Sequence, residues 1–174
     1  MNRQPEDYRL VVAGLDDNGA AVFVDPPPPA ARTVPGTSSS AYFWRVVGEH
    51  SVPTSVGGPA TWAGPASKDG SAVAIVRIEA GADTRRDLSE FLDDTAQGGH
   101  ADDGMHATHT IDYELILSGK IDFVLPGEQR RTLHAGDLLV VTGAPHVWDN
   151  PYEEDCVYLS ITIAAPPSDT HQDG

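Results

Sequence analysis

The sequence predicts an all-β protein. Short runs of β-branched, aromatic and other apolar residues are separated by turn signals rich in Gly, Pro, Asn and Asp. The pattern is clearest from Gly104 to Asn150, where each run has about the length of one strand. A chain of 174 residues can bury a sizeable core in a single unit. We therefore expect one β domain spanning residues 1–174, organised around this stretch.

The central stretch divides into strands and tight connections. Ser118-Gly119-Lys120 predicts a hairpin between its first two strands, and Pro126-Gly127-Glu128 predicts a second turn. The expected strands are 111–117, 121–125, 138–141 and 146–148, with further corners at 134–137 and 143–145.

Alternation along these strands assigns their faces. If Asp112 faces one side of its strand, Glu114, Ile116 and Ser118 share that side. The opposite side, formed by Tyr113, Leu115 and Leu117, is then wholly apolar. Two antiparallel segments can in this way present a metal-site composition to one interior: His106, His109, Asp112 and His146.

The second half of the stretch carries a family resemblance. Gly136-Asp137, Gly143, His146 and Asn150 fit the second motif of the cupin superfamily, including the spacing of the last two residues. Val141 stands where a proline is usual, and the gap from Gly136 to His146 is one residue short. The resemblance covers roughly the C-terminal third of the chain and implies a double-sheet jelly-roll barrel.

The first cupin motif is present in modified form. Asp112 takes the position of the usual ligand glutamate, and His106 takes that of the first histidine. Thr108 occupies the position of the second histidine, so His109 is one residue late. If a bulge turns His109 inward, the resemblance implies a site of three histidines and one carboxylate; otherwise the set is His106, His146 and Asp112.

The resemblance implies one divalent metal ion, which the sequence does not identify among Fe, Mn, Ni, Zn and Cu. Glu114 shares the face of Asp112 and is an alternative oxygen ligand. In the other interpretation the barrel holds no metal, and the histidines are hydrogen-bonded in a polar cavity. Imidazole and carboxylate donors are compatible with both interpretations.

The rest of the chain supplies further strands and one insertion. We expect N-terminal strands between residues 8 and 50, an extended connection over 26–40, and a barrel core over about 71–164. Leu88, Phe91 and Leu92 have helical spacing and predict a short helix at 87–94. The other expected strands are 8–13, 20–24, 41–47, 71–79 and 156–163, and the tail 166–174 is expected to be disordered.

Several residues are candidates for chemistry and substrate contact. Glu114 is the candidate general acid or base, because it lies beside the expected metal ligands. Arg77 lies among apolar strand residues, where it either meets solvent or clamps a carboxylate inside the cavity. The expected pocket residues are Trp148, Ile116, Arg77 and Tyr158.

Composition excludes several kinds of partner. The net charge of −15 argues against nucleic acid and anionic membranes, which need clustered Lys and Arg. No apolar run is long enough to span a membrane and the N-terminus has no secretory pattern, so we expect a cytoplasmic protein. The one cysteine, Cys156, is expected in the core. The aromatic run Tyr42 to Trp44 is expected in the core or in a dimer interface. Together with the apolar face of Tyr113, Leu115 and Leu117, it exceeds what one small barrel needs and predicts a homodimer.

Two classes of function fit these observations. The first is a metal-dependent enzyme acting on a small carbonyl or carboxylate metabolite, as a lyase, dehydratase, decarboxylase or cyclase. A dioxygenase is the oxidative variant of that class. The second is a non-catalytic barrel that binds a small ligand. Because one fold supports many reactions, the resemblance alone does not choose between them.

Overall fold

The computed structural model describes residues 3–24, 26–50, 58, 60, 64, 69–82, 84, 97–100 and 105–165. Within these residues the regular structure is β-strand except for one 3-10 turn, η1 (Pro5–Asp7). No helix in this part of the chain is long and apolar enough to cross a membrane.

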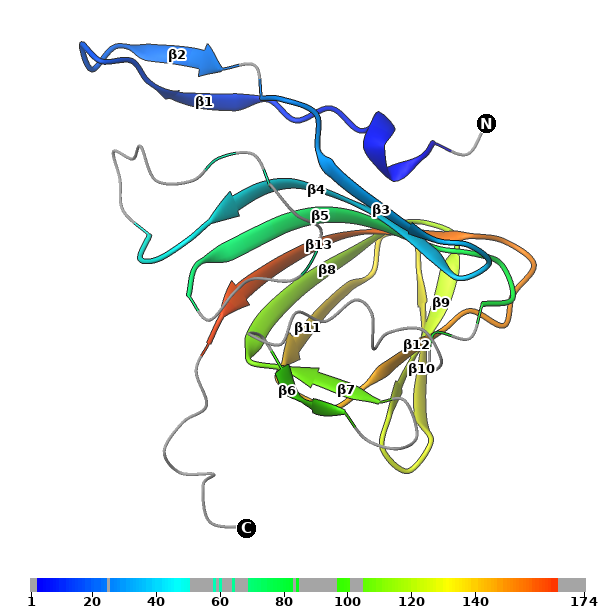
Figure 1. The fold of residues 1–174 in the computed structure, drawn as a ribbon. Coiled ribbons are helices and arrows are strands. Elements are labelled where there is room, and N and C mark those ends of the chain that lie inside the picture. The colour runs from blue at the N-terminus through cyan, green and yellow to red at the C-terminus, as the bar shows by residue number, and fades with distance from the viewer. Residues whose placement is uncertain are drawn as a thin grey trace, which may run out of the picture.

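Two antiparallel sheets face each other and form the body of the molecule (Figure 1). The larger sheet has six strands in the order β11-β8-β13-β5-β4-β3, and the smaller has three in the order β10-β9-β12. The all-β, double-sheet barrel predicted from the sequence is therefore confirmed. The larger sheet contains β3 (Ala30–Val34), β4 (Ser38–Val46), β5 (Ser71–Ile78), β8 (Thr110–Ser118), β11 (Leu138–Thr142) and β13 (Cys156–Ala164). The smaller contains β9 (Lys120–Leu125), β10 (Gln129–His134) and β12 (Val147–Asp149).

Two short hairpins complete the described structure. The strands β1 (Val12–Leu15) and β2 (Ala21–Val24) pair with each other and extend away from the six-stranded sheet (Figure 1). The strands β6 (Gln97–His100) and β7 (His106–Thr108) form the second pair. The chain continues from β7 almost directly into β8, so His106 enters the barrel beside the strand that carries Asp112.

The connection at Gly119 is a corner between the sheets, which corrects the predicted hairpin. β8 pairs with β11 and β13, whereas β9 pairs with β10 and β12. Gly119 has a φ of 71°, and a Cβ there would lie 2.2 Å from the carbonyl oxygen of Asp155. Glycine is required because the left-handed backbone and the close approach both exclude a side chain. The predicted turn at 126–128 does join a hairpin, β9 to β10.

The main core lies between the sheets. It contains buried apolar side chains from both: Ile78, Ile116, Ile121, Phe123, Val141, Trp148, Cys156 and Tyr158. Cys156 is fully buried, and burial raises the pKa of its thiol to about 12. Its expected place in the core is confirmed, and the thiol is inert there.

A second cluster covers the outer face of the larger sheet. Ala41, Phe43, Ile75 and Val157 are buried there, with Tyr8, Leu10, Leu117 and Leu159 packed against them. The segment after η1 thus covers part of the apolar face that was expected to meet a second subunit. The cluster also fixes the faces of β5, because Ile75 points outward and Val76 inward.

The N-terminal region departs from the prediction in one place. Residues 26–40 are not all an extended connection, because β3 lies within them and pairs with β4 from Ala30↔Tyr42 to Val34↔Ser38. The run Pro26 to Pro29 ends before β3, so the prolines remove no donor from that strand. The predicted helix at 87–94 and the tail at 166–174 lie outside the described residues.

Asn150, the last residue of the second motif, fixes the loop that connects β12 to β13. Its side-chain amide donates to the carbonyl oxygens of Ile78, Glu79 and Glu154 at 3.0–3.2 Å. Its amide oxygen accepts from the backbone N–H of Tyr152 at 3.3 Å. A fully buried amide with these bonds fastens the loop to the end of β5.

Candidate active site between the sheets

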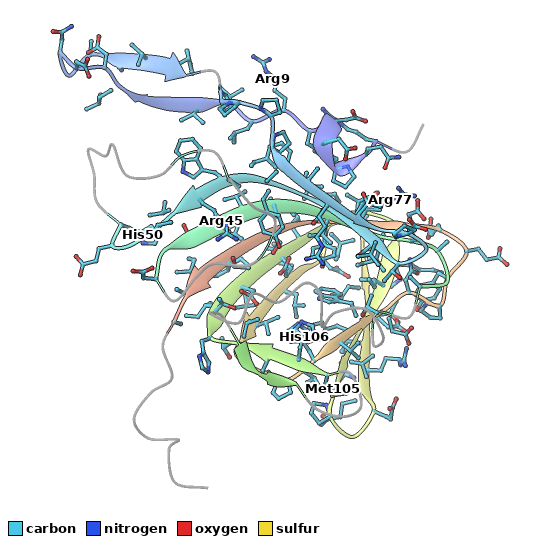
Figure 2. The ribbon with its side chains drawn as sticks, in the orientation of Figure 1. Arg9, Arg45, His50, Arg77, Met105 and His106 are labelled. Atoms are coloured by element: carbon cyan, nitrogen blue, oxygen red, sulfur yellow. The ribbon has the colours of Figure 1, made fainter. Side chains whose placement is uncertain are left out.

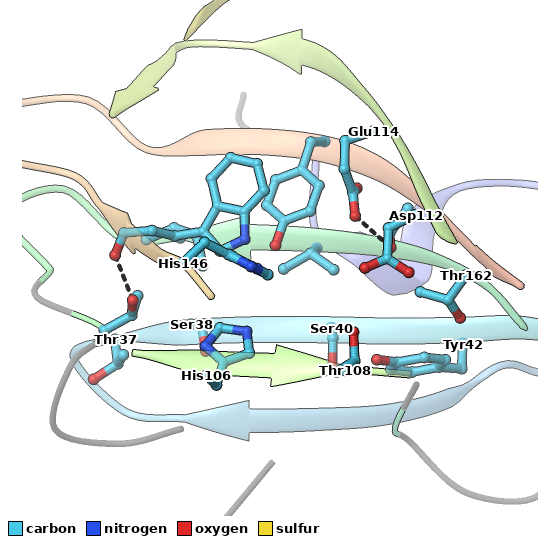
Figure 3. A pocket seen from close by; sticks show the side chains of 16 residues that line it. Thr37, Ser38, Ser40, Tyr42, His106, Thr108, Asp112, Glu114, His146 and Thr162 are labelled. Atoms are coloured by element: carbon cyan, nitrogen blue, oxygen red, sulfur yellow. Dashed lines mark hydrogen bonds between the residues drawn. The ribbon is translucent and has the colours of Figure 1, made fainter. Parts of the chain in front are cut away.

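A cavity of about 120 Å³ opens between the two sheets (Figure 3). Side chains from β4, β5, β7, β8 and β13 line it, together with those just before and within β12. Many of these side chains carry hydroxyl groups, and an apolar wall is formed by Val76, Ile78 and Trp148. A cavity of this size is comparable to an engineered cavity of about 150 Å³ that holds benzene.

A pair of histidines forms one part of the wall. His106 and His146 exchange both backbone hydrogen bonds, at 3.0 and 2.9 Å, across an antiparallel bridge. Their ring centroids are 4.3 Å apart, and the ring of Phe123 stacks on His146 at 4.8 Å. The backbone bridge explains why residues from the two motifs meet: it joins the end of the insertion to the corner before β12.

The tautomer of His146 follows from its hydrogen bond. Its Nδ1 lies 2.8 Å from the carbonyl oxygen of Ala144, which can only accept, so Nδ1 carries the hydrogen. The other ring nitrogen, Nε2, then has a free lone pair, and the ring faces the cavity (Figure 3). Burial lowers the pKa of His146, so the neutral imidazole is favoured. In this tautomer, Nε2 of His146 can accept a proton from a molecule in the cavity.

A pair of buried acids forms another part of the wall. Asp112 and Glu114 are each 6% exposed and follow each other on the inner face of β8. Burial raises the pKa of Asp112 to about 6, although hydrogen bonds from Thr110 and Thr108 oppose this. Burial and the charge of Asp112 raise the pKa of Glu114 well above its usual value, against a hydrogen bond from Ser160. Glu114 is thus favoured as a neutral carboxylic acid.

The structure resolves the ambiguity over His109. Its side chain is exposed, while those of Thr108 and Thr110 are buried and their hydroxyl groups are 2.6 Å apart. No bulge occurs between β7 and β8 to rotate the chain, so Thr108 keeps the inward position. The structure therefore places His109 outside the cavity, and Thr108 faces inward in its place.

The remaining donors do not reproduce the predicted metal centre. Among the described residues, no group of three His, Cys, Asp or Glu side chains is close enough to hold an ion. In Figure 3 the two imidazoles lie together, and the carboxyl groups of Asp112 and Glu114 lie farther along the cavity. The ligand set His106, Asp112 and His146 therefore does not fit a metal in this arrangement.

The other predicted pocket residues divide into two groups. Trp148 and Tyr158 line the cavity and stack on each other at 4.8 Å. Ile116 shares the inner face but is only 1% exposed and lies in the core behind the cavity. Arg77 is corrected: it lies on the outer face of β5, where its Nε donates to Asp155 at 2.9 Å and an NH group donates to Gln4 at 2.8 Å.

Some wall residues were not predicted. Ser38, Ser40 and Tyr42 alternate along β4 and face the cavity, whereas Tyr42 was expected in a core or an interface. The sequence offered no clear signal for this face, because residues 37–40 are all Thr or Ser and do not alternate. Thr84 was also missed; its hydroxyl donates to the carbonyl oxygen of Trp148 and fixes that edge of the cavity.

Comparison with known proteins finds similar chains among solved structures. No protein-family profile matches the chain. The cupin domain of Cnp3 from Schizosaccharomyces pombe is 13% identical, with a TM-score of 0.47 over 89% of this chain and 86% of that chain. DMSP lyase DddQ from Ruegeria pomeroyi is 21% identical, with a TM-score of 0.39 over 63% and 47%. These likenesses concern the fold alone.

Sequence comparison finds shorter matches. Phomopsin biosynthesis cluster protein D from Diaporthe leptostromiformis is 46% identical over 46 residues, or 26% of this chain and 24% of that protein. Oryzines biosynthesis cluster protein J from Aspergillus oryzae is 33% identical over 63 residues, or 36% of this chain and 35% of that protein. The matches span only about a quarter to a third of these relatives.

The strand order and the second-motif residues define the class of protein. The chain is a double-sheet jelly-roll barrel in which two histidines and a pair of buried acids share one cavity.

Proposed function

We propose that this protein is an enzyme of the lyase or isomerase type that acts on a small oxygenated metabolite by acid–base chemistry. The observation that carries the proposal is that a proton acceptor, His146, and a buried acid, Glu114, line the same cavity. Acids and bases whose pKa values are shifted by burial in a cavity are typical of catalytic sites.

The two groups have complementary roles. His146 Nε2 accepts a proton from the carbon beside a substrate carbonyl, because its lone pair faces the cavity. Glu114 donates a proton to an oxygen of the substrate, either the carbonyl oxygen or a departing hydroxyl group. Transfer to the carbonyl oxygen gives an enol, and transfer to the hydroxyl group releases water.

Other wall residues support the assignment. Ser160 Oγ donates to Glu114 Oε1 at 3.1 Å and so fixes the orientation of the acid. Trp148 and Tyr158 provide a flat wall suited to a small planar enol. The cavity limits the buried part of the substrate to about the size of benzene.

The reaction proposed relies on groups of the protein. The sequence resemblance implied a metal-dependent version, but the described imidazoles and carboxylates do not group as three ligands. Elemental analysis of the purified protein tests this point. A stoichiometric transition metal that is lost in both His106→Ala and His146→Ala would restore the metal-dependent version.

Dehydration of 4-hydroxy-2-butanone tests the proposal, because loss of water gives an enone with strong ultraviolet absorbance. We expect turnover by the wild type, and a loss of about 100-fold or more in His146→Ala and in Glu114→Gln. Tyr113→Phe is the matched control, since Tyr113 lies between Asp112 and Glu114 but is 45% exposed on the outer face. Undiminished turnover by both site variants would disprove the assignment.

A further inference from the structure

Two carboxylate oxygens in the cavity wall have no hydrogen-bond partner among the described residues. They are Asp112 Oδ1 and Glu114 Oε2, and both belong to side chains that are more than nine-tenths buried. A buried acceptor without a donor costs about 1–3 kcal/mol, and more when it is charged. Both side chains line the cavity, so a molecule inside it can supply the missing hydrogen bonds.

A second contact orients the Glu114 carboxyl group. Its Oε1 accepts from Ser160 Oγ at 3.1 Å, which leaves Oε2 for a molecule in the cavity. Asp112 lies beside the hydroxyl groups of Thr108 and Thr110, which are 2.6 Å from each other. Because Glu114 is favoured as the neutral acid, the pair offers a ligand one hydrogen-bond acceptor, Asp112 Oδ1, and one carboxylic acid, Glu114.

The charge of the cavity wall narrows the class of ligand. None of the Lys or Arg side chains that the structure describes lines the cavity. Arg77 is engaged outside the sheet with Asp155, and Arg130 with Asp122 and Asp149. Arg45 lies nearer, over the ring of Tyr42 at 5.7 Å, but it does not line the cavity. A ligand carboxylate or phosphate at the acid pair would therefore meet the like charge of Asp112 directly.

We infer that Asp112 and Glu114 form a subsite that binds a hydroxyl or ammonium group of a substrate without negative charge at that end. This inference rests on the proposed function and narrows it, because the sequence alone left carboxylate metabolites open. A hydroxyl group suits the pair best. It donates to Asp112 Oδ1 while its oxygen faces the Glu114 carboxyl group, from which the proposed reaction protonates a departing hydroxyl.

Three small ligands with the same carbon skeleton test the inference: glycerol, 2-amino-1,3-propanediol and glycerate. Their binding is followed by NMR through the methyl signals of Thr108, Thr110 and Thr162, which lie near the pair or line the same cavity. We expect glycerol and the ammonium compound to shift these signals at concentrations about tenfold or more below those needed with glycerate. Glycerate binding as tightly as glycerol would overturn the inference.

Variants then assign the binding to the pair. In Asp112→Asn we expect both donor ligands to bind about 10- to 100-fold more weakly, the range for a hydrogen bond to a charged group. Tyr113→Phe should bind as the wild type does. If Asp112→Asn is folded and binds both ligands unchanged, the subsite is not at Asp112. Because these titrations need no turnover, they can fail while the dehydration assay succeeds, and the reverse outcome is equally distinguishable.

Discussion

At the scale of single residues, Asp112 illustrates the cost of the site. Burial raises the pKa of its carboxyl group from 3.8 to about 6. Between about pH 4 and 6 the folded protein retains this proton while the unfolded chain loses it, so the free energy of unfolding falls as pH rises. Above about pH 6 the whole loss of stability is present. At 1.36 kcal/mol per unit, the cost is about 3 kcal/mol.

Asp112→Asn should therefore be more stable than the wild type at pH 7, by up to about 3 kcal/mol. The amide cannot ionise, so the advantage should shrink as pH falls and vanish near pH 4. Thermal denaturation of both proteins between pH 4 and 7 measures this difference. Equal stability across the range, or an advantage that grows towards low pH, would contradict the account.

Alternation predicted the acid pair, but it could not assign side chains whose orientation depends on distant contacts. Period-2 spacing from Asp112 grouped Glu114 on the same face, and the second motif supplied His146. Whether His109 or Thr108 faces inward depends on the presence of a bulge, which local sequence does not specify. The outward orientation of Arg77 depends on its ion pair with Asp155, which is 78 positions away in the chain.

At the scale of elements, Gly119 fixes the corner between the sheets. Gly119→Ala should destabilise the protein by several kcal/mol, because the new Cβ would lie 2.2 Å from a backbone oxygen. Gly127→Ala is the matched control: its φ is 74°, close to the 71° of Gly119, but no atom lies within 4 Å of its added Cβ. The control should lose only about 1–2 kcal/mol, the cost of the left-handed backbone.

Urea denaturation of the two variants measures the contrast between clash and backbone strain. Equal destabilisation of Gly119→Ala and Gly127→Ala would mean that the approach to Asp155 does not constrain the corner. The comparison also shows why the hairpin prediction failed. A glycine with positive φ serves a hairpin and a corner equally well, and the choice depends on which strands are available to pair.

Strands with regular apolar alternation were predicted with small errors at their ends. β5, β8 and β13 match the expected runs to within one residue at most ends, because one face of each is buried. β4 begins three residues early, at Ser38, since serine is a weak strand signal and its polar face lines the cavity.

At the scale of the whole molecule, exposed apolar side chains of the described residues gather in two places. On the outer face of the larger sheet, Leu138, Val140 and Tyr113 are 74%, 54% and 45% exposed, and Val140 pairs with Tyr113. On the N-terminal hairpin, Phe23 of β2 is 82% exposed. This hairpin extends away from the six-stranded sheet (Figure 1). Figure 2 shows the same hairpin extending from the sheet with its side chains drawn. Exposed apolar strands of this kind are commonly covered by a second copy of the chain.

The homodimer expected from the sequence therefore remains a prediction, now placed on β11 and β8. Sedimentation at micromolar concentration should show a species of twice 18.5 kDa. Leu138→Glu should shift it towards the monomer, whereas Phe23→Ser shows whether the N-terminal hairpin also contributes. A single 18.5 kDa species in the wild type would remove the dimer from the account.

Deuterium incorporation tests the central claim most directly, because it follows proton removal without requiring the complete reaction. The protein is treated with a chelator and incubated with 4-hydroxy-2-butanone in D₂O, and the signal of the carbon between the carbonyl and the hydroxymethyl group is followed by NMR. We expect metal-free wild type to catalyse exchange, with a loss of about 100-fold or more in His146→Ala. Exchange that disappears with the metal, or that survives unchanged in His146→Ala, would contradict the account.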